Sequence, residues 1–219
     1  MATDFARANN SCSAILLAED LIHLRPTFLP TGKPLTYPQY EFLVSKGIDP
    51  EGVTYLAGGS EGQVFINSRT QMAMKFFESA HDFRHTIWLE QTLTAKIQQA
   101  GYKFASSTKI DSVNLLIEHR LMGGLTIYHF TRENVHNNRE RWQAAFNQHR
   151  RAFKKLRKAL RQDPIFVDES RLGERGYFDL IDGFFKHEGE TYYLNLHQDN
   201  ILVTETSPGK FEFTIIDLR

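Results

Sequence analysis

The sequence predicts an α+β fold whose first part is rich in strands. From Val53 to about residue 78, alternating apolar residues are bounded by glycines and polar turns, a pattern typical of antiparallel strands. Residues 82–101 and 139–162 instead repeat apolar residues every three or four positions, which predicts amphipathic helices. The chain has 219 residues, 41% of them hydrophobic, and can form one large or two small packed units.

The charge balance and the lone cysteine restrict the class of protein. Because 26 basic residues face 26 acidic ones, the chain as a whole is not drawn to nucleic acid or to an anionic membrane. Cys12 has no partner for an internal disulfide, which suits a reducing compartment. The apolar run at residues 14–18 ends at Glu19 and is too short to span a bilayer. We expect a cytoplasmic protein without a membrane partner.

The first fifty residues differ from the rest of the chain. Prolines at positions 26, 30, 38 and 50 bias their predecessors away from helix, so only short elements fit. One short helix is predicted over residues 38–46, with proline in its first turn and Gly47 at its end. We expect residues 1–50 to form an arm or a lid.

A glycine-rich turn precedes a lysine in an apolar strand. Gly58, Gly59 and Gly62 lie in the first predicted hairpin, where the missing side chains allow backbone amides to approach an anion. Lys75 follows within "MAMKFF", and a buried ammonium requires a partner or a ligand. Glu90 on the following helix is a candidate ion-pair partner. The alternative is an ordinary turn and a lysine whose charged end reaches water.

The helix predicted over residues 139–162 is strongly basic. Its apolar stripe packs in a core in the simpler interpretation, which leaves the basic residues in solvent. In the alternative interpretation, the basic face binds the phosphates of nucleic acid or an acidic partner. The stripe comprises Trp142, Phe146, His149, Phe153, Leu156 and Leu160, and the basic face comprises Arg150, Arg151, Lys154, Lys155, Arg157, Lys158 and Arg161.

Four short motifs follow one another along residues 53–219. They are "AGGSEGQV" (57–64), "MAMK" (72–75), "LLIEHRLMGG" (115–124, continuing an apolar strand predicted at "VNLLI", 113–117) and "FTIIDLR" (213–219). Their order resembles the glycine loop, the "VAIK" lysine, the hinge and the "DFG" site of the protein-kinase-like superfamily. Ala57 replaces the usual first glycine, and Leu218 and Arg219 replace Phe-Gly. The resemblance implies a two-lobed fold with a β-rich N-lobe over residues 51–125 and a helical C-lobe over residues 126–219. This C-lobe is truncated, without the activation segment and the peptide-docking helices.

The same resemblance implies that the chain binds ATP with Mg²⁺. Lys75 would contact the nucleotide phosphates with Glu90 as its helix partner, and the backbone of Glu118 and Arg120 would face adenine. The metal ligands would be Asn200 and Asp217. The implied nucleotide-binding residues are Gly58, Gly59, Gly62, Val64, Ala73, Lys75, Glu118 and Arg120.

The segment "NLHQDNILV" (195–203) is similar to "DLKPENILV" of protein kinases. It is still more similar to "DLHPxNIL" of aminoglycoside and atypical kinases, including those in polyvalent proteins of phages and mobile elements. This match places Asn195 where the family has its catalytic aspartate, but an amide cannot accept the substrate proton. His197 stands where the family has Lys or His near the phosphate. In a shifted register His197-Gln198-Asp199 would replace "HRD", with Asp199 as the base, and Asn200 would lose its spacing.

Three functions are consistent with the sequence. The first is a phosphotransferase that acts on a protein hydroxyl, because positioning and charge neutralisation carry most of phosphoryl transfer. The second is a pseudokinase-type module that binds nucleotide and a partner with little or no turnover. The third is a nucleic-acid-binding protein that uses the basic helix. The nine histidines show no paired spacing such as HExxH and no cysteine pair accompanies them, so no zinc site is predicted.

Overall fold

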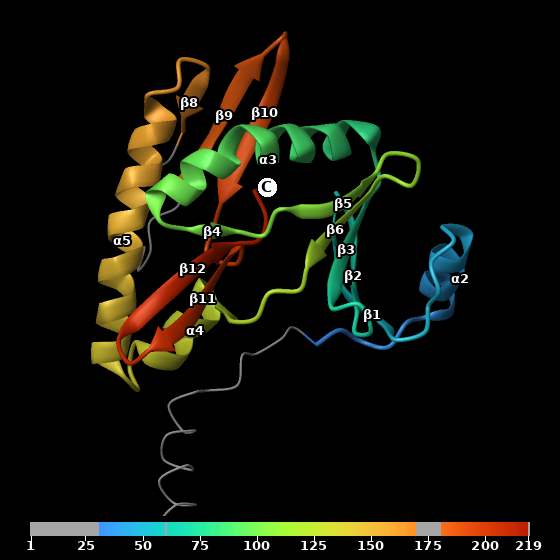
Figure 1. The fold of residues 1–219 in the computed structure, drawn as a ribbon, viewed down its shortest axis with the longest axis horizontal. Helices are drawn as coiled ribbons and strands as arrows, with labels where there is room; N and C mark the ends of the chain where they lie inside the picture. Colours follow the sequence, from blue (N-terminus) through green and yellow to red (C-terminus); the bar gives the residue numbers. More distant parts are fainter. Residues whose placement is uncertain (1–30, 60, 170–180, 219) are drawn as a thin grey trace, which may run out of the picture.

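The computed structural model describes residues 31–59, 61–169 and 181–218, and these residues form an α+β fold (Figure 1). The first elements along the chain are α2 (Tyr37–Ser45), β1 (Val53–Gly59), β2 (Gly62–Asn67), β3 (Met72–Phe77), α3 (Ala80–Ala100), β4 (Lys103–Phe104), β5 (Ser107–Asp111) and β6 (Leu116–Arg120). They are followed by β7 (Leu125–Thr126), α4 (Ile127–Asn134), α5 (Arg139–Arg161), β8 (Phe166–Asp168), β9 (Ile181–His187), β10 (Glu190–Leu196), β11 (Ile201–Ser207) and β12 (Lys210–Ile215).

The first part of the chain forms a five-stranded antiparallel sheet in the order β1-β2-β3-β6-β5. Period-2 alternation divides β3 between two faces. Met74 and Phe76 are buried in a core with Phe65, whereas Lys75 lies on the opposite face, next to Val64 of β2.

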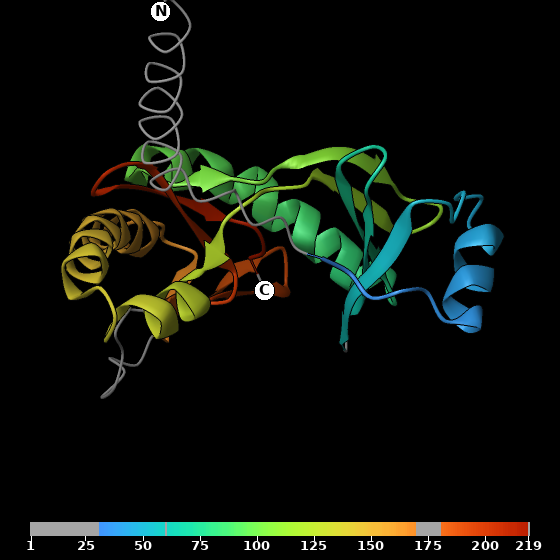
Figure 2. The same cartoon turned by 90° about the horizontal axis from the view of Figure 1, so that it is seen from below.

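The predicted short helix is confirmed as α2, which begins at Tyr37. It packs on the sheet through Leu43 and through Phe42, whose ring lies 5.1 Å from that of Phe76. Seen from below, α2 lies at the end of the molecule opposite α5 (Figure 2). Residues 1–30 of the predicted arm lie outside the described residues.

Gly62 is required by the β1–β2 hairpin itself. Its φ of +148° is rarely adopted by residues with a side chain, and a Cβ there would lie 1.9 Å from the carbonyl oxygen of Phe76. A Cβ at Gly59, the last residue of β1, would meet no heavy atom within 4 Å. The hairpin therefore needs a glycine at 62 for its close contact with β3, but not at 59.

Replacing Gly62 by alanine is expected to destabilise the protein by about 1–3 kcal/mol, because β3 must shift away from the new Cβ. Gly59→Ala is the matched control and should change the free energy of unfolding by less than about 0.5 kcal/mol. Urea unfolding of both variants measures the difference. Equal stability of the two variants would contradict this structural role.

The predicted helix at 82–101 is confirmed as α3, which begins two residues earlier. The hydroxyl of Ser79 caps it by accepting from the Asp82 amide at 3.0 Å, and Gly101 ends it with a φ of +99°. Its apolar stripe, Leu89, Leu93 and Ile97, enters a core shared with α5 and β9–β12. This helix extends from the five-stranded sheet towards α5 (Figures 1 and 2).

Helix α5 confirms the core-helix interpretation of the basic segment. His149, Phe153, Leu156 and Leu160 are buried, while Trp142 and Phe146 stack at 5.2 Å and are partly covered. Burial lowers the pKa of His149 to about 3, so its imidazole is neutral in the core. The basic residues 150, 151, 154, 155 and 158 are exposed, and Arg157 and Arg161 pair with Asp168.

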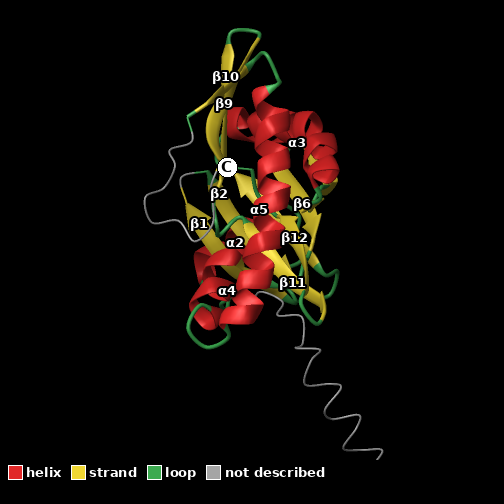
Figure 3. Cartoon of the chain, turned by 90° about the vertical axis from the view of Figure 1, so that its left-hand side faces the viewer, coloured by secondary structure: helices red, strands yellow, loops and turns green. Residues whose placement is uncertain are grey.

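The C-terminal part contains more strands than expected. The prediction of a helical C-terminal part was incomplete, because two sheets accompany α4 and α5, in the orders β10-β9-β8 and β4-β12-β11-β7 (Figure 3). A hairpin at Glu188-Gly189 connects β9 to β10, and these two residues have φ values of +51° and +82°. Strand β4, which follows α3, pairs in parallel with β12 and so joins the two parts of the chain.

The strand predicted at "VNLLI" lies later in the chain than expected. The carboxylate of Asp111 accepts from the amides of Val113 and Asn114 at 3.0 and 3.1 Å, and this forms a turn. Strand β6 begins only at Leu116 and continues to Arg120. In the part of the chain that the structure describes, no helix has both the length and the apolar composition needed to cross a membrane.

Candidate functional site

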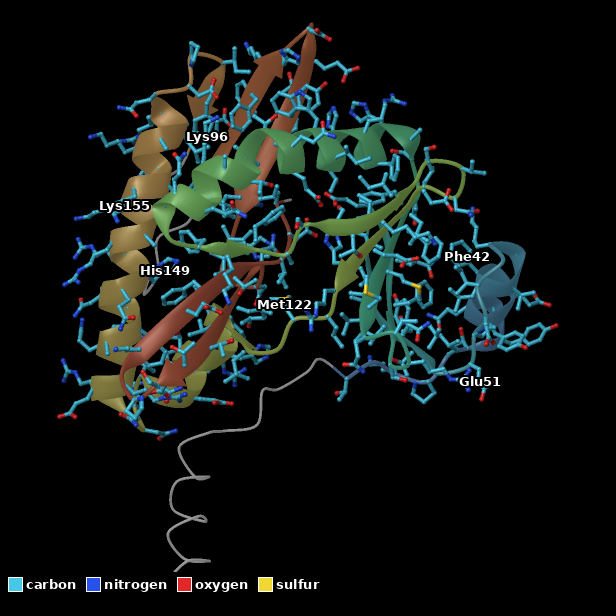
Figure 4. All side chains as sticks on the ribbon, in the orientation of Figure 1. Phe42, Glu51, Lys96, Met122, His149 and Lys155 are labelled. Atoms are coloured by element: carbon cyan, nitrogen blue, oxygen red, sulfur yellow. The ribbon has the colours of Figure 1, made fainter. Side chains whose placement is uncertain are left out.

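A cavity of about 600 Å³ lies between the five-stranded sheet and the C-terminal strands. It is closed on one side by the segment from Leu121 to Gly124 that joins β6 to β7, on which Met122 is marked in Figure 4. Residues distant in sequence meet in its wall. Among them are Val64, Ala73, Lys75, Thr86, Glu90, His119, Arg120, Asp199, Asn200 and Asp217.

Lys75 is held in this wall by two carboxylates. Its Nζ lies 2.7 Å from Oδ2 of Asp217 and 3.2 Å from Oε2 of Glu61. Burial alone would lower the pKa of Lys75, but the two carboxylates outweigh it and raise the pKa above its ordinary value. The expectation that Lys75 needs a partner is met. The sequence analysis missed Glu61, although an acidic residue inside the glycine turn was a visible signal.

The prediction that Lys75 forms an ion pair with Glu90 was wrong, because Lys75 contacts Asp217 and Glu61 instead. Oε2 of Glu90 accepts from the amide and the hydroxyl of Ser107, at 3.2 and 2.6 Å. Its other carboxylate oxygen lies 3.8 Å from Nε2 of His119. Ser107 offers two donors to a buried carboxylate, and Asp217 already neutralises Lys75, so the helix carboxylate turns to β5. Lys75 and Glu90 still share the cavity wall.

Thr86 was also missed by the sequence analysis. It lies one turn before Glu90 on the same face of α3, is 4% exposed and lines the cavity. Its buried hydroxyl has no hydrogen-bond partner among the described residues. A buried polar group is costly without a partner, which suits a polar ligand in the cavity.

Asn200 lies in the turn between β10 and β11, and Asp217 lies just after the end of β12. The Asn200 side chain donates to the carbonyl of Asn195 at 3.3 Å, and the Asn200 carbonyl accepts from the amide of Ile216 at 2.9 Å. This second bond places Asn200 beside the residue that precedes Asp217. An amide oxygen and a carboxylate in one wall are the hard oxygen donors that Mg²⁺ prefers, with phosphate oxygens completing the coordination. The pair therefore fits the implied metal.

The candidate base residues occupy different positions. Asn195 is exposed on β10, its amide donates to the carbonyl of Leu218 at 3.0 Å, and it does not line the cavity. Asp199 does line the cavity, with 55% of its side chain exposed. His197 lies outside the wall, and its Nδ1 accepts from the Asp199 amide at 3.2 Å. Asp199, and not Asn195, therefore lines the cavity, and the Asp199 carboxylate lies 3.8 Å from Nδ1 of His197.

Some of the other residues predicted to bind the nucleotide line the cavity, and others do not. Val64, Ala73 and Arg120 line the cavity, but Glu118 does not: its carbonyl accepts from Thr108, and its carboxylate pairs with Lys109 at 3.0 Å. Glu118 was predicted to face adenine, but β6 lies later in the chain than expected. Residues 121–124, and not Glu118, therefore form the segment that borders the cavity between β6 and β7. The three glycines lie at the hairpin and outside the wall: Gly58, Gly59 and Gly62.

Comparisons of the chain with protein-family models, with curated proteins and with solved structures find no significant match. The geometry of this cavity and the motifs that supply its residues are therefore the features that indicate a function.

Proposed function

We propose that the protein is a kinase-like phosphotransferase that binds ATP with Mg²⁺ in this cavity and acts on a protein hydroxyl. One observation carries the proposal. Lys75, Asn200 and Asp217, each supplied by a different motif, line the same cavity together with Glu90, the predicted helix partner of Lys75. Their residue types match the needs of phosphoryl transfer, in which positioning and charge neutralisation dominate. The two parts of the fold then act as the two lobes that flank a nucleotide.

The apolar walls of the cavity suit an adenine ring. Val64 and Ala73 come from the five-stranded sheet, Leu202 comes from β11, and Ile216 directly follows β12. A flat aromatic base fits between two such walls, and few polar contacts are then needed to orient it. The connecting segment at residues 121–124 borders the same space and offers backbone groups to the base edge.

Lys75 would hold the phosphates. In this structure it is paired with Asp217 at 2.7 Å. A phosphate group offers Lys75 another anionic partner, and this exchange releases the Asp217 carboxylate for Mg²⁺. Mg²⁺, when bound, neutralises charge on the transferring phosphoryl group. Asn200 would orient the same ion from the turn between β10 and β11, and Glu90 would keep α3 joined to β5 through Ser107.

Asp199 is the residue that we assign as the base. A carboxylate can accept the proton of the attacking hydroxyl, whereas the amide of Asn195 cannot. Asp199 is partly exposed in the cavity wall, where an incoming protein side chain could reach it. If neither residue acts as a base, the chain is instead the pseudokinase-type module, which binds nucleotide without turnover.

Thermal unfolding with and without ATP and Mg²⁺ tests the proposal. A ligand at about 100 times its Kd stabilises the folded state by about 2.7 kcal/mol, which raises the Tm of a chain of this size by about 5–10 °C. The rise should largely disappear when EDTA removes Mg²⁺. An unshifted Tm at millimolar ATP would contradict nucleotide binding. Duplex DNA binding that is lost on reversing Lys154, Lys155 and Lys158 would then favour the nucleic-acid-binding alternative.

A further inference from the structure

Two histidines and a glutamate meet on the side of α3 that faces the β9–β10 hairpin. His81 and His85 are one helical turn apart, and their ring centroids lie 3.9 Å from each other. Glu190, the first residue of β10, places Oε2 3.6 Å from Nε2 of His85. One ligand atom from each of the three residues lies within 4.8 Å of the other two. The expectation that the histidines lack paired ligand spacing was wrong, because positions 81 and 85 have the i, i+4 spacing of HExxH.

One separation in the cluster is close to that in a transition-metal site, and all three ligand atoms lie within 4.8 Å of one another. Zinc binds imidazole nitrogen at about 2.0–2.1 Å, so two ligand atoms of a tetrahedral site lie about 3.4 Å apart. The separation between His85 and Glu190 is 3.6 Å. Two imidazoles and one carboxylate are a donor set that zinc uses with a water or another ligand in the fourth position. Mg²⁺ prefers oxygen donors, so this site differs in chemistry from the one at Asn200 and Asp217.

Neighbouring aromatic residues hold the candidate ligands in place. The hydroxyl of Tyr192 donates to Oε2 of Glu190 at 3.1 Å, and the Tyr192 ring lies 4.4 Å from that of His85. The ring of Trp88 stacks on the ring of Tyr192, with 4.0 Å between the two centroids. Such supporting hydrogen bonds orient metal ligands and are typical of functional metal sites.

The three candidate ligands differ in how far they are exposed to solvent. His85 is buried, with 3% of its side chain exposed, whereas 47% of Glu190 is exposed and His81 lies at the surface. An ion could enter from solvent and displace water from His81 and Glu190 without unfolding the helix.

We propose that His81, His85 and Glu190 bind a first-row divalent metal ion, with Zn²⁺ as the best-suited ion. The ion joins the first turns of α3 to the β9–β10 hairpin, two elements that also share the hydrophobic core and an aromatic stack. The same helix carries Thr86 and Glu90 into the cavity wall. Metal binding therefore fixes the position of the wall of the cavity, and it does so whether or not the cavity binds ATP.

Titration of the full metal-free chain with Zn²⁺ and with Co²⁺ tests the site. Calorimetry should show one equivalent of Zn²⁺, and Co²⁺ should produce the visible absorption of a low-symmetry, four-coordinate site. Loss of a supporting hydrogen bond alone weakens metal sites by about 10–100-fold, so His81→Ala and Glu190→Gln, which remove direct ligands, should weaken Zn²⁺ binding by at least this factor. The matched control is His136→Ala, because His136 is exposed and lies outside the cluster.

The two ligand variants change exposed side chains, so their Tm without metal should stay close to that of the wild type. The rise in Tm caused by Zn²⁺ should be present in the wild type and in His136→Ala and absent in both ligand variants. Zn²⁺ binding that survives both substitutions would place the ion elsewhere and overturn the proposal. A wild-type chain that shows no binding would equally overturn it and leave the cluster as aromatic packing.

Discussion

Replacing Asp217 by asparagine is expected to weaken binding of ATP with Mg²⁺ by at least about 30-fold, since removing one charge from a buried ionic contact costs about 2–5 kcal/mol. Asparagine preserves the shape of the side chain and can still accept from the Leu218 amide, which now donates to Oδ1 at 2.8 Å. The loss would therefore come from charge at the metal site. At an ATP concentration that shifts the wild type, the rise in Tm should vanish.

Lys75→Ala should also weaken binding of ATP with Mg²⁺, because it removes the positive charge that is proposed to hold the phosphates. Because the pKa of Lys75 is raised, the lysine stays protonated through neutral pH and loses its charge only as pH rises above its ordinary value of 10.5. ATP binding should therefore show no step from Lys75 between about pH 6 and 9. Isothermal titration of both variants across this range measures the affinity directly.

Lys109→Ala is the matched control for these variants. Lys109 is an exposed lysine that pairs with Glu118 at 3.0 Å on the same sheet and lies outside the cavity. It should leave the ATP-dependent shift intact. Folded Lys75→Ala and Asp217→Asn proteins that keep the full shift would contradict the proposed nucleotide site.

Asp199→Asn is expected to lower the rate of phosphoryl transfer by about 10²–10⁴-fold while ATP affinity stays near that of the wild type. The reason is that an amide at this position can still orient a hydroxyl but cannot take its proton. Asn195→Ala should have little effect, because Asn195 lies outside the cavity wall. Initial rates with labelled ATP at saturation separate the chemical step from binding.

Glu140→Gln, which changes an exposed carboxylate in the first turn of α5, controls for the loss of one negative charge. The rates of the residue 195 and residue 199 variants also distinguish the two candidate base positions. If Asn195→Asp raises the rate and Asp199→Asn leaves it unchanged, the base position belongs to residue 195, as the motif match implies. Transfer that is absent from the wild type but present in Asn195→Asp would identify the chain as the pseudokinase-type module.

Local sequence signals specify several elements of this fold. The apolar stripes of α3 and α5 have the helical period, Gly101 ends α3, and Glu188-Gly189 turns a hairpin, whereas the start of α3 at Ala80 was not predicted. Each signal lies within a few residues of the structure it specifies, so no knowledge of distant contacts is needed. The same reasoning missed the position of β6, because the turn around Asp111 competes with an apolar run that resembles a strand.

Tertiary structure alone decided which side chains meet. Lys75 pairs with Asp217, 142 positions later, and not with Glu90 on the adjacent helix. Asp199 enters the cavity wall while Asn195 stays outside it, although the two are separated by a single turn of chain. His85 meets Glu190 only because the β9–β10 hairpin packs on α3. Motifs can name charged residues, but their partners are chosen by distance, burial and competition among donors, and these quantities exist only once the chain is folded.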